Sequence, residues 1–403
     1  MFDMKVLALG YLPKWRGGRQ LTGLATGIFD LHDAVNSLED SVEVTIAATD
    51  FFVDQTKVEH TPIVGWTKAL LIKHAIKRFY RLPFFLSKAV WISRRTGLMP
   101  VADSFAKLLM LDRAIDLVNP DVIHLHGASY AYFINALWRN KRPVVLRLHG
   151  LNGYDATIPN FERYRIIEKD IIGFNFSCVT FVTNDICEDW KLKYGSFNCP
   201  MIPIINGYNS NVFFPPKDKV EKQYDLITIS GISDRKGQGR VIDALKLLMD
   251  EGKNLSYLIV GNGDKDYTEL IKRKAKEYEL KVEFMNYCPQ DKLNELLWKS
   301  KWFIQPSASE GFGKTYIESI AAGTPVLVPK HLPIVKEKNL LTSVNSIIHD
   351  DESVKSIFDC LKQVDFSKQY DYESVSESVV HFSWENLAKS YVSIYKTHCY
   401  NEK

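Results

Sequence analysis

The sequence predicts an α/β protein with two domains, each built on a parallel sheet with crossover helices. Apolar runs of strand length alternate with helix-length segments along the whole chain. The alternation stops at a stretch rich in proline and charge, 211–219, and then begins again. A chain of 403 residues is long enough for two such domains, each with its own core.

The two series of elements can be placed from the apolar runs and the turn residues between them. In the first half we expect strands at 6–9, 42–47, 122–126, 144–149, 180–183 and 201–205. In the second half we expect strands at 226–230, 256–260, 282–285, 302–305 and 326–328, and helices at 239–250, 266–279 and 290–299. A last helix is predicted from Ser383, a capping residue type, to Tyr395.

Composition excludes several classes of protein. Hydrophobic content of 46% and charged content of 25% are typical of a globular protein. The net charge of +3 and the lack of basic arms argue against a nucleic-acid partner. Six scattered cysteines without a Cys-x-x-Cys pair indicate reduced thiols, and no run approaches the ~18 apolar residues of a membrane span. The apolar N-terminal run fits a buried strand better than a signal peptide, so we expect a cytoplasmic protein.

The most informative stretch is 307–325, Ser-Ala-Ser-Glu-Gly-Phe-Gly-Lys-Thr-Tyr-Ile-Glu-Ser-Ile-Ala-Ala-Gly-Thr-Pro. Glu310 and Glu318 lie on either side of a glycine-rich turn that opens a helix. The N–H groups of a helix start suit a phosphate, and the carboxylates accept hydrogen bonds from hydroxyls. A ligand with both phosphate and sugar parts, such as a nucleotide-sugar, fits this pattern.

Other glycine turns follow predicted strands. Gly17 and Gly18 follow the first strand, where backbone can approach a diphosphate closely, although an ordinary turn has the same residues. The turn 231–237 adds Arg235 and Lys236, cations that can neutralise a diphosphate leaving group. The turn 261–263 lacks the third glycine and the later acidic residue of a dinucleotide fingerprint, which argues against a nicotinamide site.

Two further polar positions have competing interpretations. Asp264 and Asp266 resemble a metal motif, but they stand where a loop enters a helix, and we interpret them as capping residues and expect no metal site. His149 ends a predicted strand, where a histidine is either a hydrogen-bonded core residue or a site residue.

Segment 66–95 reads as an amphipathic helix with basic side chains along one arc. That arc holds Lys73, His74, Lys77, Arg78 and Arg81, and the opposite arc is apolar, with Ala69, Ile72, Ala75, Ile76, Phe79 and Tyr80. One interpretation is a solvated basic face on a helix whose apolar face is packed in the core. The other is a basic surface that docks on anionic lipid.

Together these motifs resemble the retaining glycosyltransferases of GT-B fold in family 4. The resemblance covers nearly the whole chain, from Gly17-Gly18 through Pro120-Asp121-Val122-Ile123-His124-Leu125-His126, His149-Gly150 and Ile205-Asn206-Gly207 to the Lys236-Gly237 loop, the Glu310–Glu318 block and Phe382-Ser383-Trp384. It implies two Rossmann-like domains facing each other across a cleft, with a C-terminal helix that crosses back to the first domain. We therefore expect domains at 1–207, joined by the helix 383–403, and at 208–382.

The resemblance also implies roles for individual residues. Glu310 lies beside the donor sugar, with the backbone of Phe312, Gly313 and Lys314 at its hydroxyls. Glu318 binds the ribose, the N–H groups near Thr315 hold the phosphates, and Lys236 neutralises the diphosphate. Gly17 and Gly18 approach from the other domain, His149 lies near the reacting carbon, and Tyr287 lies in the stretch that holds the base.

The implied reaction is a metal-independent, retaining transfer from a nucleotide-diphosphate sugar, with UDP or GDP as the nucleotide, through a same-face displacement. The chain departs from the family at Ile232, where the family usually has arginine, and Arg235 is the candidate replacement. Two alternatives remain: a sugar-nucleotide epimerase of the same fold, and a silent subunit that binds nucleotide without catalysis. The basic arc, with Lys73, Lys77, Arg78 and Arg81, favours a lipid-linked saccharide acceptor in bacterial surface-polysaccharide assembly, and hence a peripheral position at the inner face of the plasma membrane.

Overall fold

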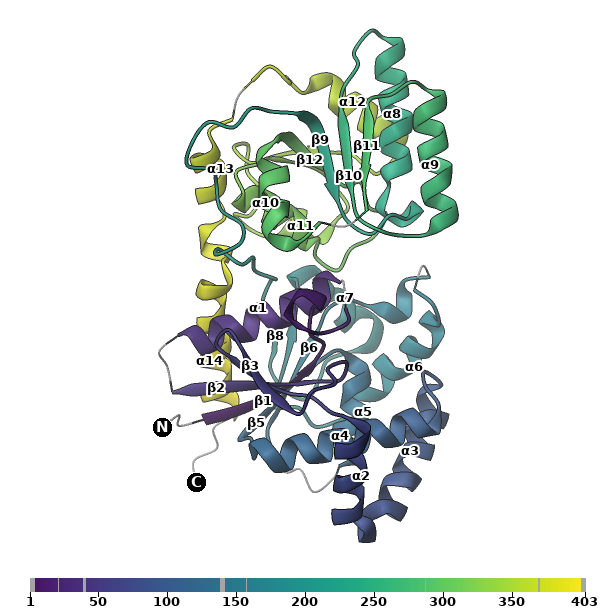
Figure 1. The fold of residues 1–403 in the computed structure, drawn as a ribbon, viewed down its shortest axis with the longest axis vertical. Coiled ribbons are helices and arrows are strands. Elements are labelled where there is room, and N and C mark those ends of the chain that lie inside the picture. Colours follow the sequence, from purple (N-terminus) through teal and green to yellow (C-terminus); the bar gives the residue numbers. More distant parts are fainter. Residues whose placement is uncertain are drawn as a thin grey trace. The chain divides into compact units, whose positions relative to one another are not determined.

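The computed structural model describes residues 4–20, 22–38, 41–137, 142–156, 158–286, 288–368 and 370–399. The chain forms two compact units. Unit 1 contains the chain through Asn206 together with the last helix, and unit 2 contains Gly207 to Ser383. Each unit is built on one sheet with helices on its faces (Figure 1). The predicted α/β class is confirmed.

The sheet of unit 1 has the strand order β3-β4-β2-β1-β5-β6-β7-β8. The strands are β1 (Met4–Gly10), β2 (Val42–Ala48), β3 (Gln55–Val58), β4 (Thr61–Val64), β5 (Val122–His126), β6 (Val144–Leu148), β7 (Cys178–Phe181) and β8 (Met201–Pro203). The β3–β4 pair is antiparallel and the other neighbouring strands are parallel. Sequence analysis missed β3 and β4 because β3 is a short polar edge strand, largely exposed.

Helices cover this sheet, and the last one comes from the far end of the chain. They are α1 (Gly23–Ser37), α2 (Lys68–Lys77), α3 (Leu82–Thr96), α4 (Val101–Val118), α5 (Ala128–Ala136), α6 (Phe161–Ile171), α7 (Asn184–Tyr194) and α14 (Trp384–Cys399), with 3-10 turns η1 (Lys14–Arg16), η2 (Phe79–Arg81) and η3 (Asn152–Tyr154). Helix α14 packs beside α1 and buries Trp384, Tyr391 and Tyr395 in the same core as β1 and β2. Burial of these large aromatic side chains ties the C-terminal helix to unit 1.

Unit 2 has a fully parallel sheet in the order β11-β10-β9-β12-β13-β14. Its strands are β9 (Tyr224–Ile229), β10 (Tyr257–Val260), β11 (Val282–Met285), β12 (Ser300–Ile304), β13 (Val326–Pro329) and β14 (Ser346–His349). Its helices are α8 (Gln238–Asp250), α9 (Lys265–Glu277), α10 (Gln290–Trp298), α11 (Lys314–Ala321), α12 (Val354–Gln363) and α13 (Tyr372–Glu377), with 3-10 turns η4 (Asp234–Lys236), η5 (Pro333–Lys336) and η6 (Val380–Phe382). The five strands predicted here are all present, and β14, α12 and α13 are additional.

The structure corrects the prediction for segment 66–95. The basic arc does not face solvent as a whole, because Arg78 and Arg81 turn toward carboxylates of α4 and His74 is buried against Asp112. The apolar arc is largely exposed, most strongly at Phe79, whereas only Lys73 and Lys77 of the basic arc are exposed. His74, Arg78 and Arg81 lie on one arc and contact the acidic residues of α4. These contacts hold the basic arc against the protein, whereas the core-packing interpretation placed the apolar arc there.

No helix within the described residues is long and apolar enough to cross a membrane.

Candidate functional site

Three loops of unit 2 meet at one edge of its sheet. They follow β9, β10 and β12, which are neighbours in the order β10-β9-β12, and parallel strands bring their carboxyl ends to the same edge. The loops are 230–237, 261–264 and 305–313. Most of the phosphate-binding and sugar-binding positions predicted in the second half lie in these loops or in the first turn of α11. The exceptions are Glu318, which lies one turn further along α11, and Tyr287.

Glu310 is held at this edge by three side chains from two loops. Its Oε1 accepts hydrogen bonds from Gln305 Nε2 at 2.9 Å and from Ser307 Oγ at 2.8 Å, and the Lys236 ammonium forms an ion pair with the same oxygen. The Glu310 side chain is 11% exposed. Polar donors from two loops therefore fix one carboxylate oxygen beside a cation, which is a preorganised arrangement. Gln305 and Ser307 were not singled out from the sequence, although Gln305 is the last residue of the predicted strand 302–305 and Ser307 follows two residues later.

Arg235 and its neighbours join the loop after β9 to the loop after β12. Arg235 donates from Nη1 to the carbonyl of Ser309 at 2.6 Å, and its own carbonyl accepts from Ala308 N at 2.8 Å. Gly237 has φ +82°, and a Cβ there would lie 2.4 Å from the carbonyl oxygen of Pro306. Only glycine fits this close approach of two backbones. Arg235 therefore holds the Glu310 loop in place.

Ile232 occupies the position where an arginine was expected from the resemblance. Its side chain is 3% exposed and belongs to the core of unit 2. Its backbone N–H donates to Asn262 O at 3.0 Å and its carbonyl accepts from Asp264 N at 3.1 Å, which ties it to the loop after β10. A Cβ on Gly263 would lie 1.8 Å from the carbonyl oxygen of Ile232. The aliphatic side chain is thus a core residue, directed away from the polar edge.

Helix α11 begins at the same edge. Gly313 precedes it with φ +89°, a conformation that favours glycine. Glu318, one turn further on, forms an ion pair with Lys314 at 2.8 Å, and both side chains are nearly buried. Thr315 lies in the first turn with its hydroxyl 3.5 Å from Gln305 Oε1, and Phe312 is 2% exposed. The start of α11 thus presents backbone N–H groups, with a carboxylate on its own helix, as predicted.

Unit 1 carries its own glycine loop after β1. Gly17 has φ +88°, and a Cβ on Gly18 would lie 2.0 Å from the carbonyl oxygen of Leu12. Asp50, which follows β2, accepts hydrogen bonds from Leu12 N and from Arg19 N, each at 3.1 Å. One buried carboxylate therefore closes both ends of this loop. Sequence analysis missed Asp50, although an aspartate just after a buried strand is the available signal.

His149 follows β6 and belongs to a chain of histidines. His149 Nε2 lies 3.2 Å from His126 Nδ1, and His126 Nε2 lies 2.7 Å from His32 Nε2. Burial, together with the charge of Arg147, lowers the pKa of His149 well below its usual range. Burial, and then the neighbouring charges, lowers the pKa of His126 in the same direction. The imidazole of His149 is therefore a neutral hydrogen-bonding group held by a second imidazole, not a cation.

Two groups of described residues have ligand atoms close enough for a metal ion. One is His32, His124 and His126, and the other is His74, Asp112 and Asp116. The first group is already joined by the 2.7 Å hydrogen bond between His32 and His126. In the second, Asp112 and Asp116 accept from guanidinium groups. Protein partners thus account for the second group, whereas His32 Nδ1 and His124 Nε2 of the first group are buried without a hydrogen-bond partner among the described residues.

Two other predicted positions have simple outcomes. Asp264 caps α9, accepting from Tyr267 N at 2.8 Å, so the capping interpretation is confirmed for Asp264, whereas Asp266 lies in the first turn of the helix. Tyr287 lies outside the described residues.

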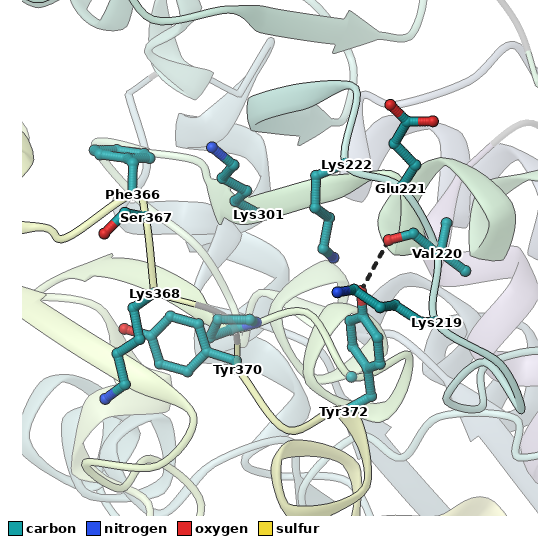
Figure 2. Close-up of a pocket in the computed structure, with 12 residues that line it drawn as sticks. Lys219, Val220, Glu221, Lys222, Lys301, Phe366, Ser367, Lys368, Tyr370 and Tyr372 are labelled. Atoms are coloured by element: carbon teal, nitrogen blue, oxygen red, sulfur yellow. Dashed lines mark hydrogen bonds between the residues drawn. The ribbon is translucent and has the colours of Figure 1, made fainter.

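The opposite edge of the unit 2 sheet has a pocket of about 520 Å³ (Figure 2). Lysine and tyrosine side chains surround it, but its central cations already have protein partners. Lys222 Nζ donates to the backbone carbonyls of Trp298, at the end of α10, and Ser300, at the start of β12, and it lies 4.6 Å from the centroid of the Tyr372 ring. Lys301 pairs with Asp225 at 2.8 Å. These lysines join structural elements, and the pocket is separate from the Glu310 edge.

Two family models together match most of the chain. Residues 35–211 match the model of Glycosyltransferase Family 4, and residues 210–357 match that of Glycosyl transferases group 1. The chain belongs to this glycosyltransferase family. An uncharacterised glycosyltransferase of Methanocaldococcus jannaschii is 25% identical over 279 residues, covering 63% of this chain and 72% of the relative. The GPI3 subunit of phosphatidylinositol N-acetylglucosaminyltransferase from Saccharomyces cerevisiae is 22% identical, covering 93% and 80%.

Solved structures of GT-B glycosyltransferases have the same fold. Sucrose-phosphate synthase of Thermosynechococcus elongatus aligns over 98% of each chain with a TM-score of 0.72 and 16% identity. HepE of Anabaena, solved in complex with UDP-glucose, aligns over 97% of this glycosyltransferase and 100% of its own chain, with a TM-score of 0.69 and 17% identity. The GT-B fold class predicted from the sequence is confirmed.

Proposed function

We propose that this glycosyltransferase transfers a hexosyl group from a nucleotide-diphosphate sugar to a hydroxyl acceptor, with retention of anomeric configuration and without a metal ion. The observation that carries the proposal is the Lys236–Glu310 pair beside the start of α11. A cation and a helix N-terminus at one edge suit a diphosphate, and a fixed carboxylate beside them suits sugar hydroxyls. The complex of HepE with UDP-glucose supports a UDP-sugar as the donor, and a GDP-sugar has the same diphosphate chemistry.

Each residue then has a chemical task. Lys236 and the N–H groups near Thr315 stabilise the negative charge that develops on the leaving diphosphate. Glu310 accepts hydrogen bonds from the sugar hydroxyls, and Glu318 accepts them from the ribose. His149, neutral at pH 7, exchanges a hydrogen bond with the sugar near the reacting carbon.

The bond between the anomeric carbon and the diphosphate oxygen breaks as the acceptor oxygen bonds to the same face of the sugar. The acceptor's proton passes to the departing diphosphate oxygen. Glu310 has its Oε1 engaged by three protein donors and acts here as a hydrogen-bond acceptor for the substrate rather than as a nucleophile. We also propose that the backbone at Gly17 and Gly18 can approach a diphosphate closely.

The acceptor that we propose is a lipid-linked saccharide of bacterial surface-polysaccharide assembly, at the cytoplasmic face of the plasma membrane. Support comes from the GPI3 relative, whose enzyme is named for transfer to phosphatidylinositol. The exposed apolar side chains of α2 and η2 are a second support.

Nucleotide release from a panel of UDP- and GDP-sugars, with and without lipid-linked acceptor, tests the proposal. We expect acceptor-dependent release that chelator does not change, with a product of retained configuration by NMR. Glu310→Gln and Lys236→Ala should each lower kcat/KM by at least about a hundredfold, because each removes charge placed for the transition state. Lys246→Ala, on the exposed side of α8, is the matched control. Interconversion of the donor without acceptor would support an epimerase instead, and nucleotide binding without any release would support a silent subunit.

A further inference from the structure

The end of α2 and the following turn expose a cluster of large apolar side chains. Ile72 is 61% exposed, Ile76 68%, Phe79 71% and Tyr80 58%. Ile72 and Ile76 are one helical turn apart and therefore share a face of α2. These four residues are called the apolar tip below. Figure 1 shows α2 extending away from the sheet of unit 1.

The orientation of α2 is fixed by ion pairs on its other face. Asp112 of α4 accepts from His74 at 2.9 Å and from Arg81 at 2.8 Å, and Arg78 pairs with Asp116. Burial alone would raise the pKa of Asp112, but the hydrogen bond from His74 and the charges of Arg81 and Arg78 bring it below its usual range. A buried carboxylate held by His74, Arg78 and Arg81 does not let the helix rotate, so the exposure of the apolar tip is a consequence of the fold.

The surroundings of the apolar tip are positively charged. Between residues 66 and 100 the sequence has no aspartate or glutamate, and its basic residues are Lys68, Lys73, Lys77, Arg78, Arg81, Lys88, Arg94 and Arg95. Lys68, Lys73 and Lys77 are exposed on α2 itself, beside the apolar tip. The nearby Asp116 of α4 is paired with Arg78. A segment that combines large apolar side chains with lysines and has no acidic residue of its own complements one partner especially well, a bilayer with anionic headgroups over an apolar interior.

We propose that the apolar tip inserts into the headgroup region of an anionic lipid bilayer, with Lys68, Lys73 and Lys77 at the phosphate level. This reverses the sequence-based picture, in which the basic arc as a whole faced the lipid. The guanidinium groups of Arg78 and Arg81 hold α2 on α4 and take no part in lipid contact. The docking surface does not depend on the donor chemistry proposed above, because no donor residue belongs to α2 or η2.

Flotation of the full chain with vesicles, without nucleotide-sugar, tests this inference. Vesicles of phosphatidylcholine containing 30 mole per cent phosphatidylglycerol should bind the protein, as about that anionic content gives a strong surface potential. The triple variant I72S/I76S/F79S should lose at least about tenfold in partition coefficient, because it removes the inserted apolar area. K73A/K77A should lose roughly fivefold per lysine at low salt and little at high salt. Leu192→Ser is the matched control, since Leu192 is 84% exposed on α7 and lies outside the apolar tip.

Insertion itself can be measured separately from binding. In F79W, brominated lipid should quench the new fluorescence, whereas L192W should show no added quenching. Vesicle binding that survives the triple substitution, or absence of binding to anionic vesicles, would overturn the proposal. A triple variant that instead converts a dimer to a monomer in sedimentation velocity, with no vesicle binding by the parent, would assign the apolar tip to a second copy of the chain. Because nucleotide release is assayed on its own, failure here leaves the proposed transfer reaction standing.

Discussion

The buried histidines of unit 1 should make this glycosyltransferase unstable in mild acid. Burial lowers the pKa of His32 to about 3, with a further contribution from Arg147. Burial, and then the neighbouring charges, places the pKa values of His124, His126 and His149 well below their usual range. In the unfolded chain each histidine titrates near pH 6.5. The unfolded state therefore binds more protons than the folded state as the pH falls below about 6.5, and stability is lost in that direction.

The magnitude follows from proton linkage. A histidine that stays neutral when folded costs about 1.2 kcal/mol of unfolding free energy between pH 7 and pH 5.5, so the four together cost about 5 kcal/mol. Glu168 acts in the opposite sense, because burial raises its pKa to about 7 despite hydrogen bonds from Tyr194 and Gly153. Because Glu168 binds a proton in the folded protein but not in the unfolded chain over this interval, it adds roughly 1.5 kcal/mol to the unfolding free energy. The net expected loss, about 3 to 4 kcal/mol, is a large share of the usual stability of a domain.

Amide hydrogen exchange measures this loss for unit 1 directly. Peptides from β5 and β6 report on unit 1, and peptides from β9 and β12 report on unit 2, with exchange corrected for the intrinsic effect of pH. In His32→Gln the loss between pH 7 and pH 5.5 should shrink by about 1.2 kcal/mol, since one titrating group is removed. His60→Gln, at a side chain that is 61% exposed, is the control. Equal opening free energies for β5 and β6 at the two pH values, or an unchanged slope in His32→Gln, would refute the linkage argument.

Three further predictions concern residues that hold loops and helices in place. Ile232→Arg, which restores the residue expected from the family, should lower the unfolding free energy of unit 2 by about 3–5 kcal/mol because it buries a charge in an apolar core. Thermal denaturation measures the loss. A stable variant with higher activity would contradict this prediction. Asp50→Ala should leave two backbone donors of the glycine loop without partners, at about 1–3 kcal/mol each, and speed proteolysis within 11–20; an unchanged cleavage rate would count against the role of Asp50. Arg81→Ala should destabilise unit 1 by about 1–3 kcal/mol in urea titration. Vesicle binding per folded molecule should not weaken, because Asp112 keeps its other partners. Weaker vesicle binding by a variant of unchanged stability would instead place Arg81 in contact with lipid.

Much of the fold could be read from the sequence because its signals are local. Continuous apolar runs such as 257–260 are typical of strands buried on both faces, and a glycine turn followed by Lys314 opens a helix. The edge strand β3 escaped because it is polar, short and stabilised by pairing with β4 alone. Lys236 and Glu310, the proposed donor residues, could be named individually from their motifs, but nothing in the sequence spacing determined which carboxylate would pair with the lysine.

The sequence by itself determined the two parallel-sheet domains, the glycine loops at the strand ends and the two glutamates around the start of α11. Tertiary structure decided how these groups are used. Parallel pairing of β10, β9 and β12 brings Lys236 onto Glu310 and lets Gln305 and Ser307 fix that carboxylate. In the folded structure Ile232 packs in the core of unit 2, and the glycine loop of unit 1 is hydrogen-bonded to Asp50. The orientation of α2 depended most clearly on tertiary contacts. A helical wheel uses only the sequence of the helix itself, whereas the carboxylates that hold its basic face belong to α4, more than thirty residues away along the chain.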